Sequence, residues 1–433
     1  MPDFCLKQTI LFICEGGITE EMKIEERETC DSMPAISTHQ VKVAFREAGR
    51  AFLLSRGLIL VVSILGSLLI PLFNAGSVAN CTRGIQASSC VLMWYHWDAI
   101  IYTGIAYGGY GFFAPSVAFY PLWPLLMHFG GLLLGGVYPL SYYLAGLLLA
   151  NFCFFFALVL FYCLLVEDFG PAQARRALFY LALYPYVLYF FVGYSEALFL
   201  LLCLAVFLLL RRGRALDWWL AGLLGFLASL TRSTGLVLSV PFFVVYIQRF
   251  WLPSRRAQSS FRQKLNAFVP ILLIPAGILV YMVYLGYVKG NPLIAESFEW
   301  TYWHRHFTPI WDSFLPVLKS LMKGPFFSFG SVRDGIDLLF TLLPIVALFL
   351  GWKRLPLHYS LFALSVMLFS LSFSLDTTDS LTSQPRYMAS AFPIIVVFAL
   401  WGEHRRFNRV YLALAGAVLL AYTLMFINHI WIA

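Results

Sequence analysis

A single carboxylate stands in the aromatic stretch HWDAIIYTGIAYGGYGFFAPSVAFYPLWPLL, which runs from His96 to Leu126. Asp98 is the only acid in this stretch, and its glycines and prolines make it too irregular for a membrane-spanning helix. A carboxylate at a protected interface can act as a general base if the hydroxyl group of a substrate reaches it. The alternative is that Asp98 only begins a helix, as a turn or N-cap residue.

Three further charged residues stand beside apolar segments, where a charge is costly unless it has a partner or faces water. Arg232 in TRSTG and Arg386 in QPRYM suit a phosphate group, which a guanidinium can bind with two parallel hydrogen bonds. Both could instead extend to lipid headgroups. Glu196 in GYSEALF could pair with Arg232, bind substrate hydroxyl groups together with Tyr194, or only cap a helix with Ser195.

A third polar group occurs in the segment WTYWHRHF, residues 300–307. Its two histidines, His304 and His306, form an H-x-H pair near Glu299, a pattern that can bind a metal ion. No third ligand stands at a suitable spacing, so we favour an interfacial role for this segment, Arg305 included. We expect no metal site and no cofactor.

The composition places these residues in a membrane protein. The chain has 433 residues, of which 60% are hydrophobic and 12% are charged, whereas soluble domains have about 25% charged residues. Apolar runs long enough to cross a bilayer recur from Arg56 to the C-terminus. The net charge of +8 is therefore no sign of a nucleic-acid partner.

The basic residues between the apolar runs predict the orientation of an all-α polytopic protein. Nineteen of the 30 lysines and arginines lie in six clusters, in residues 42–56, 173–176, 211–214, 249–264, 352–354 and 403–409. Because cytoplasmic loops are enriched in these residues, we place all six clusters in the cytoplasm, together with the N-terminus. The eleven helices that this requires are 57–74, 138–165, 177–193, 196–210, 217–232, 235–250, 266–288, 334–351, 358–374, 387–401 and 410–430.

Three segments then lie on the non-cytoplasmic side, namely 75–137, 289–333 and 375–386. The first two are long and aromatic, which favours helices lying along the membrane interface and puts Asp98 at headgroup depth. Residues 116–136 could be partly inserted. The acids Asp376 and Asp379 in the third segment are interpreted as a solvated loop, with a role facing carbohydrate as the alternative.

Two predicted hairpins, 177–210 and 215–248, are short for the membrane they must cross. Each leg has about 16 residues and spans ~25 Å, less than the ~30 Å hydrocarbon core. The tips, which carry Glu196 and Arg232, should therefore lie below the outer surface. We expect them to line a polar cavity that opens outward.

The N-terminal part of the chain is expected to be less ordered than the rest. Residues 1–40 are charged and are interpreted as a flexible cytoplasmic arm, whereas residues 41–433 form a single transmembrane domain. Cys81 and Cys90 flank a polar loop and could form a disulfide or remain free thiols.

No nucleotide-binding motif of the Walker or G-x-G-x-x-G type occurs in the sequence. Nucleotide-activated donors are normally cytosolic, so a donor carried by a lipid fits better with an enzyme whose site faces outward. A phosphate leaving group departs without being protonated. Transfer from a lipid phosphate therefore needs one base and cations, whereas glycoside hydrolysis needs two carboxylates.

The segment around Asp98 resembles the signature of the PIG-V-type mannosyltransferases, which add the second mannose in GPI assembly, and of their prokaryotic relatives. The matching features are Trp97-Asp98, the glycine turn from Tyr107 to Tyr110, and AFYPLWP at 118–124. The pieces YSEALF, TRSTG and PRY resemble later motifs of the family. The resemblance implies a GT-C fold and transfer of a sugar, typically mannose, from a polyprenyl- or dolichyl-phosphate carrier. It also implies that Asp98 is the catalytic base.

We therefore predict an inverting glycosyltransferase in which Asp98 is the base and Arg386 and Arg232 bind the donor phosphate. The predicted sugar and acceptor site comprises Trp97, Tyr107, Tyr110, Phe119, Tyr120, Tyr194, Glu196 and His304. The acceptor is expected to be a lipid, a glycan or a protein on the non-cytoplasmic face. The membrane is expected to be that of a prokaryotic cell, or the endoplasmic reticulum in a eukaryote.

Two other classes of protein fit part of the pattern. A flippase or transporter of lipid-linked sugars would also enclose charges in a cavity, but its site should lie near the bilayer midplane. A non-catalytic assembly subunit would share the motifs without turnover. The clustering of charges at one face favours an enzyme.

Overall fold

The computed structural model of the chain describes residues 38–69, 91–252, 260–325, 328–375 and 380–432. All but the last three residues of the predicted N-terminal arm lie outside these ranges. The same holds for Cys81, Cys90, Asp376 and Asp379, so the predictions on them stay predictions.

The described chain is helical apart from one two-stranded ribbon, which confirms the predicted all-α class. The longer helices are α3 (Thr38–Leu69), α7 (Leu140–Phe169), α13 (Phe261–Lys289), α16 (Phe329–Gly351) and α20 (Arg405–Ile427). The shorter helices of the bundle are α8 (Pro171–Ala182), α9 (Glu196–Arg212), α10 (Ala215–Thr231), α11 (Ser239–Phe250), α17 (Leu357–Leu371), α18 (Gln384–Met388) and α19 (Pro393–Trp401). Three 3₁₀ segments join described helices of the bundle, η4 (Pro185–Phe190), η5 (Ser233–Leu238) and η7 (Trp352–Arg354).

Among the described residues, six helical runs are long and apolar enough to cross a membrane. They are α3, α7, α13, α16, α20 and the run from η5 into α11. Several of the remaining predicted spans correspond to shorter helices, so the count of eleven stays a prediction. The positions of the predicted spans at 138–165, 196–210, 217–232 and 266–288 agree with α7, α9, α10 and α13.

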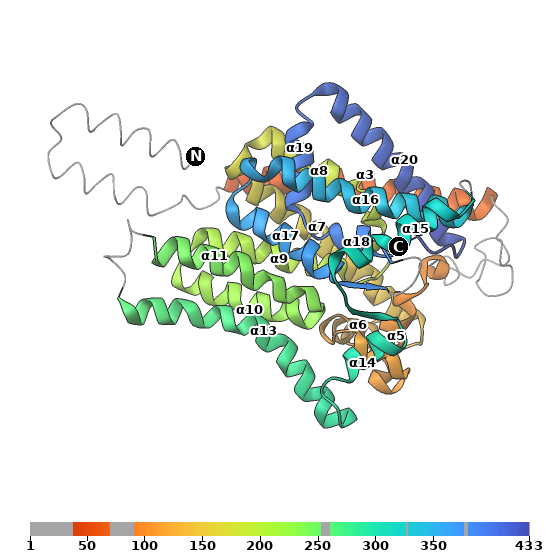
Figure 1. Cartoon of the computed structure of the whole chain (residues 1–433), viewed down its shortest axis with the longest axis horizontal. Helices are drawn as coiled ribbons and strands as arrows, with labels where there is room; N and C mark the ends of the chain where they lie inside the picture. The colour runs from red at the N-terminus through yellow and green to blue at the C-terminus, as the bar shows by residue number, and fades with distance from the viewer. Residues whose placement is uncertain (1–37, 70–90, 253–259, 326–327, 376–379, 433) are drawn as a thin grey trace.

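Helix α7 packs against α3, α6 (Leu122–Leu133), α8 and α9, and α10 packs between α9 and α13. Figure 1 shows α9, α10, α11 and α13 together as one group of helices, with α8, α16, α19 and α20 on the other side of α7. Large side chains such as Phe154, Phe161 and Phe199 are fully buried between these helices. Helix α9 therefore runs through the interior, and its two ends emerge at opposite sides of the bundle.

Two predicted spans are wrong because each is interrupted at a proline. The span predicted at 177–193 ends as an α-helix at Ala182, and the 3₁₀ segment η4 begins at Pro185. The span predicted at 387–401 is split between α18 and α19, which begins at Pro393. A residue that precedes proline is disfavoured in the α conformation, so helices tend to stop there. Both interruptions lie where the chain approaches Glu196 or Arg386.

The first predicted span, 57–74, begins too late. Helix α3 already starts at Thr38, so the basic cluster 42–56 is helical. Its acid Glu47 is buried and is contacted by Arg50 at 3.0 Å and by Arg175 of α8 at 3.1 Å. These ion pairs allow the charged turns of α3 to pack against the bundle.

The segments predicted to lie outside the membrane form short helices and the ribbon. The helices are α5 (Asp98–Gly108), α6 (Leu122–Leu133), α14 (Ile294–Thr301) and α15 (Leu315–Lys323), with 3₁₀ segments at Leu92–Trp94, Gly109–Gly111, Ala114–Ala118 and Ile310–Ser313. Strand β1 (Arg305–Phe307) pairs antiparallel with β2 (Phe373–Leu375), with Arg305 opposite Leu375. In Figure 1, α5, α6 and α14 lie together beside the ends of α10 and α13. The ribbon joins the predicted external segment 289–333 to the end of the predicted span 358–374, whose helix α17 stops at Leu371, earlier than predicted.

Candidate active site

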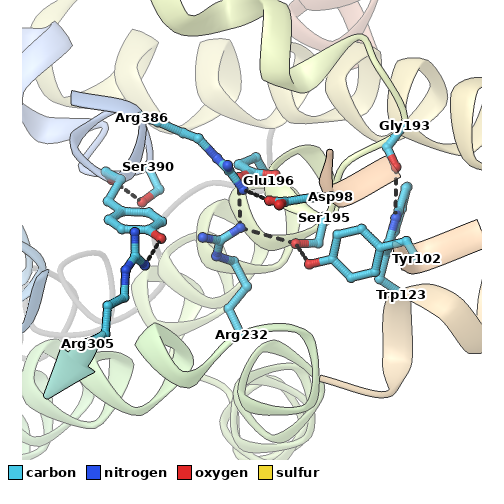
Figure 2. A network of polar contacts seen from close by, with 11 residues as sticks. Asp98, Tyr102, Trp123, Gly193, Ser195, Glu196, Arg232, Arg305, Arg386 and Ser390 are labelled. Carbon is cyan, nitrogen blue, oxygen red and sulfur yellow. Dashed lines mark hydrogen bonds and ion pairs between the residues drawn. The ribbon is translucent and has the colours of Figure 1, made fainter. Parts of the chain in front are cut away.

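Four charged side chains from distant parts of the chain meet in one network (Figure 2). Arg386 donates from Nη2 to Asp98 Oδ2 at 2.6 Å and from Nε to Glu196 Oε1 at 2.5 Å. Arg232 Nη1 lies 2.8 Å from the same Glu196 oxygen. Glu196 therefore bridges two guanidiniums, and one of these also contacts Asp98.

The chain before α9 places Glu196 at the start of that helix. Gly193 has a φ of +83°, a left-handed conformation that favours glycine, and its carbonyl oxygen accepts a hydrogen bond from Trp123 Nε1 at 3.0 Å. Ser195 is the N-cap residue, but its side chain makes no capping hydrogen bond. It instead contacts Tyr102 at 2.9 Å and accepts from Arg232 at 3.2 Å. The side chain of Ser195 is therefore bonded to the network and not to the backbone of α9.

Arg232 follows the last residue of α10, where the backbone becomes extended. The next turn lies so close to α10 that a Cβ atom on Gly235 would be 2.4 Å from the amide nitrogen of Ser229. Only glycine fits at this approach. The tight return of the chain directs Arg232 toward Glu196, as the short predicted hairpins require.

Arg386 lies in the five-residue helix α18 and is held between aromatic rings. Its guanidinium carbon is 4.8 Å from the ring centre of Tyr189 and 4.9 Å from that of Tyr194. Stacking on ring faces is favourable for a guanidinium and restricts its orientation. The hydroxyl group of Tyr194 donates to the carbonyl oxygen of His96 at 3.2 Å, which ties the rings to the segment that carries Asp98.

Asp98 begins α5, and the preceding residue, Trp97, has a positive φ of 48°. The side chain of Asp98 is 19% exposed, against 3% for Glu196 and 4% for Arg386. Of the two carboxylates in the network, Asp98 is therefore the one that a hydroxyl group arriving from solvent can reach. His96 is buried nearby, and desolvation lowers its pKa to about 4, so its ring is neutral at pH 7.

Residues 47–315 match the model of the family Mannosyltransferase (PIG-V). The chain belongs to this family. It is also 35% identical over 151 residues to GPI alpha-1,6-mannosyltransferase 2 of Cricetulus griseus. That alignment covers 33% of this chain and 29% of the hamster protein, so the similar part is less than a third of the relative's length.

Solved structures of the oligosaccharyltransferase of Archaeoglobus fulgidus also resemble this PIG-V family member. The form with an acceptor peptide tethered through a disulfide bond has a TM-score of 0.41 at 14% identity, covering 86% of this chain and 54% of the other. The form with Zn and sulfate has a TM-score of 0.38 at 15% identity, covering 86% and 52%.

Only some of the aromatic residues predicted to bind sugar and acceptor lie against the network of charged side chains. Tyr194 contacts Arg386 as described, and Phe119 packs edge-on against Tyr102. The ring of Trp97 instead packs against Phe426 and Trp431, at the end of α20.

The other predicted aromatic residues lie further from the network. Tyr110 and Tyr120 pack with Tyr281 of α13. Tyr107 is 54% exposed and stacks with Tyr138, about 13 Å along α5 from Asp98 at ~1.5 Å per residue. His304 is exposed and has a positive φ of 53°. The structure therefore does not bring Tyr107 and His304 to the network, and their predicted roles find no support in its geometry.

Arg305 is the residue of this site that the sequence analysis misses. Strand β1 brings its guanidinium over the ring of Tyr387, 5.3 Å from the ring centre, and it donates a hydrogen bond to the Tyr387 hydroxyl group. The guanidinium of Arg232 lies at the same 5.3 Å from that ring, and that of Arg386 at 5.8 Å. Three arginines thus surround one tyrosine, which directly follows Arg386 in the chain. The H-x-H pattern draws attention to the histidines on either side of Arg305 instead.

Proposed function

We propose that this chain transfers a mannosyl unit from a lipid-phosphate donor to a hydroxyl group of an acceptor, with inversion at the anomeric carbon and Asp98 as general base. Membership of the PIG-V mannosyltransferase family supports the reaction class. The observation that carries the mechanism is the convergence of Asp98, Glu196, Arg232 and Arg386, in which a partly exposed carboxylate lies against buried guanidiniums.

The reaction balances with these groups alone. The acceptor oxygen forms a bond to the anomeric carbon while its proton moves to Asp98. The bond from the anomeric carbon to the phosphate oxygen breaks, and the lipid phosphate leaves with the electron pair. Guanidiniums stabilise the negative charge that develops on that phosphate. Since the leaving group needs no proton, a second catalytic acid is not required.

Glu196 has the role of a positioning residue in this mechanism. It holds Arg232 and Arg386 by the same oxygen, while its second oxygen, Oε2, has no hydrogen-bond partner among the described residues. Because its side chain is only 3% exposed, Glu196 acts on the substrate through the two arginines that it holds.

The site faces the non-cytoplasmic side in this proposal. Helix α9 has Glu196 in its first turn and Arg211 and Arg212 in its last turn, about 25 Å apart at ~1.5 Å per residue. The positive-inside bias assigns the basic end of α9 to the cytoplasm. The network at the other end then faces outward, where a lipid-linked donor is accessible.

Replacement of the base tests the proposal. Asp98→Asn in the purified full chain should lower transfer of radiolabelled mannose from dolichyl-phosphate mannose to a membrane lipid extract by about 10²- to 10⁴-fold, the usual contribution of a general base. Asp312→Asn, which removes a carboxylate from an external segment outside the network, is the matched control and should retain activity. Equal turnover by Asp98→Asn and wild type would end the assignment of the base. A wild-type protein that moves the lipid or binds it without forming product would instead be a transporter or an assembly subunit.

A further inference from the structure

Arg305 differs from the other two arginines of the site in its partners. Glu196 contacts Arg232 and Arg386, and Asp98 also contacts Arg386. Within the described part of the chain, Arg305 has no carboxylate at ion-pair distance, and its Nε is buried without a hydrogen-bond partner. Among the described residues, its guanidinium donates one hydrogen bond, to the hydroxyl group of Tyr387. A guanidinium placed in this way retains donors for an anion.

The position of Arg305 is determined by the fold. Strand β1 is held by its pairing with β2, and the hydroxyl group of Thr308 contacts that of Ser374 at 2.9 Å just beyond the paired residues. Figure 2 shows Arg305 approaching from the end of this strand on one side of Arg232, while Asp98 lies on the other side. Arg232 therefore separates Arg305 from the proposed base.

The charges of the network leave an excess of positive charge near Arg305. Three guanidiniums gather around Tyr387, and two carboxylates, Asp98 and Glu196, are paired with them. A third carboxylate, Glu299 of α14, interacts electrostatically with Arg305 from beyond ion-pair distance, and burial raises its pKa. The three guanidiniums exceed the two carboxylates of the ion-paired network by one charge, which is the charge of a phosphodiester.

We propose that Arg305, together with Tyr387, forms the phosphate-binding part of the donor site, and that Arg232 and Arg386 mainly organise the carboxylates. The inference rests on the proposed function, since it specifies where the lipid-phosphate donor of that reaction is held. The phosphate then lies on the side of Arg232 that is away from Asp98. In this arrangement the sugar lies between the leaving group and the base.

Binding measurements can test this site without turnover. We would titrate the purified full chain with geranylgeranyl phosphate, with geranylgeraniol and with inorganic phosphate, and follow binding by calorimetry. Wild type should bind the prenyl phosphate more tightly than the alcohol. Arg305→Gln should weaken binding of the prenyl phosphate roughly 10- to 100-fold, the factor expected for losing hydrogen bonds to a charged group. Its affinity for geranylgeraniol should not change.

Two further variants control for folding and for general charge effects. Arg305→Lys keeps the charge without the forked donors and should recover part of the affinity. Lys323→Gln removes an exposed cation from α15, on the same external segment, and should bind like wild type. Unchanged affinity of Arg305→Gln for the prenyl phosphate would overturn the proposal, and so would an equal loss with Lys323→Gln. If Arg305→Gln fails to fold, the test is made with Arg305→Lys. The proposal is then overturned if Arg305→Lys binds both the prenyl phosphate and the alcohol with wild-type affinity and unchanged salt dependence. Tight binding of inorganic phosphate alone would show a site for free phosphate and contradict a lipid donor there.

Kinetic and binding measurements together distinguish a failure of the phosphate site from a failure of the proposed function. If wild type transfers mannose and Arg305→Gln has an unchanged KM for dolichyl-phosphate mannose, the function holds and the phosphate site is wrong. If wild type binds prenyl phosphate through Arg305 but forms no product, the site holds and the function is wrong. The expected result is a raised KM for the donor, with a KM for the acceptor extract close to that of wild type.

Discussion

The two ends of α9 carry polar networks built from the same kinds of residues. At its C-terminal end, Arg211 contacts Glu167 and Asp168 of α7, each at 2.9 Å, and Tyr359 of α17 donates to Asp168 at 2.8 Å. This arrangement of an arginine, two acids and a tyrosine resembles the candidate active site in composition. Its two acids are adjacent in one helix, so most of the network is formed by neighbouring segments.

The network at the N-terminal end is deeper and draws on more of the chain. The side chains of Arg386 and Glu196 are 4% and 3% exposed, whereas those of Arg211 and Glu167 are 17% and 23% exposed. Its members come from α5, α9, α18 and the residue that follows α10. Residue type is therefore a poor guide to function here. Depth and the convergence of distant segments distinguish a candidate site from a structural ion pair.

The largest difference between the two ends should appear when Glu196 is replaced. Breaking a buried ion pair by removing one partner costs about 3–5 kcal/mol, because the other charge remains buried. Glu196→Gln leaves two buried guanidiniums without this carboxylate, so we expect a loss of about that size in the free energy of unfolding of the protein in detergent. Chemical denaturation followed by tryptophan fluorescence measures it.

A double variant sharpens this prediction. Glu196→Gln combined with Arg232→Gln removes one of the two stranded cations and should recover part of the lost stability, although activity stays low. An unchanged midpoint of unfolding in Glu196→Gln would mean that water reaches the network, and the contrast in depth between the two ends would not hold.

A smaller effect is expected from His96, which is buried beside the network at the N-terminal end. Its pKa is lowered to about 4 by burial, with a further contribution from the neighbouring His429. The unfolded chain has a histidine pKa of about 6.5, so it takes up the proton first as the pH falls. The stability that His96 provides is complete above pH 6.5 and is lost toward pH 4, by about 3 kcal/mol at most.

The measurement for His96 is the midpoint of unfolding between pH 7.5 and 4.5. The variant His96→Phe should show a smaller decrease over this range than wild type, because it carries no proton. Identical pH profiles of the two proteins would show that other groups determine the acid sensitivity of the segment before Asp98.

Much of the site can be predicted from the sequence, because charges in an apolar chain are conspicuous. Asp98, Glu196, Arg232 and Arg386 each stand beside apolar segments, where an unpartnered charge is costly. The structure brings these four together, and their roles in catalysis and binding stay predictions. Hydropathy and charge do not specify which acid pairs with which arginine. Both pairings of Arg386 join residues about 200 or more positions apart in the chain.

Other features are missed for local physical reasons. Arg305 stands in an aromatic segment without helical periodicity, and a three-residue strand brings it to the site by pairing with Phe373–Leu375. Strands this short carry no signal in the sequence. The interruptions at Pro185 and Pro393 are visible in the sequence, but hydropathy averaged over a span conceals them. Tyr107 is predicted from the resemblance of its glycine turn and His304 from its residue type, and the direction of a surface aromatic cannot be read from its neighbours.

The smallest effect is expected at the C-terminal end of α9, and it completes the comparison. Arg211→Gln removes the contacts with Glu167 and Asp168, whose side chains are partly exposed, so water can replace much of the lost interaction. Ion pairs of this kind contribute up to about 1 kcal/mol, and we expect a loss of that size with mannose transfer close to wild type. Chemical denaturation and the radiolabel assay on the same preparation measure both quantities. A large loss of transfer in Arg211→Gln at unchanged stability would mean that the two ends of α9 are coupled, and function would then not reside at the N-terminal end alone.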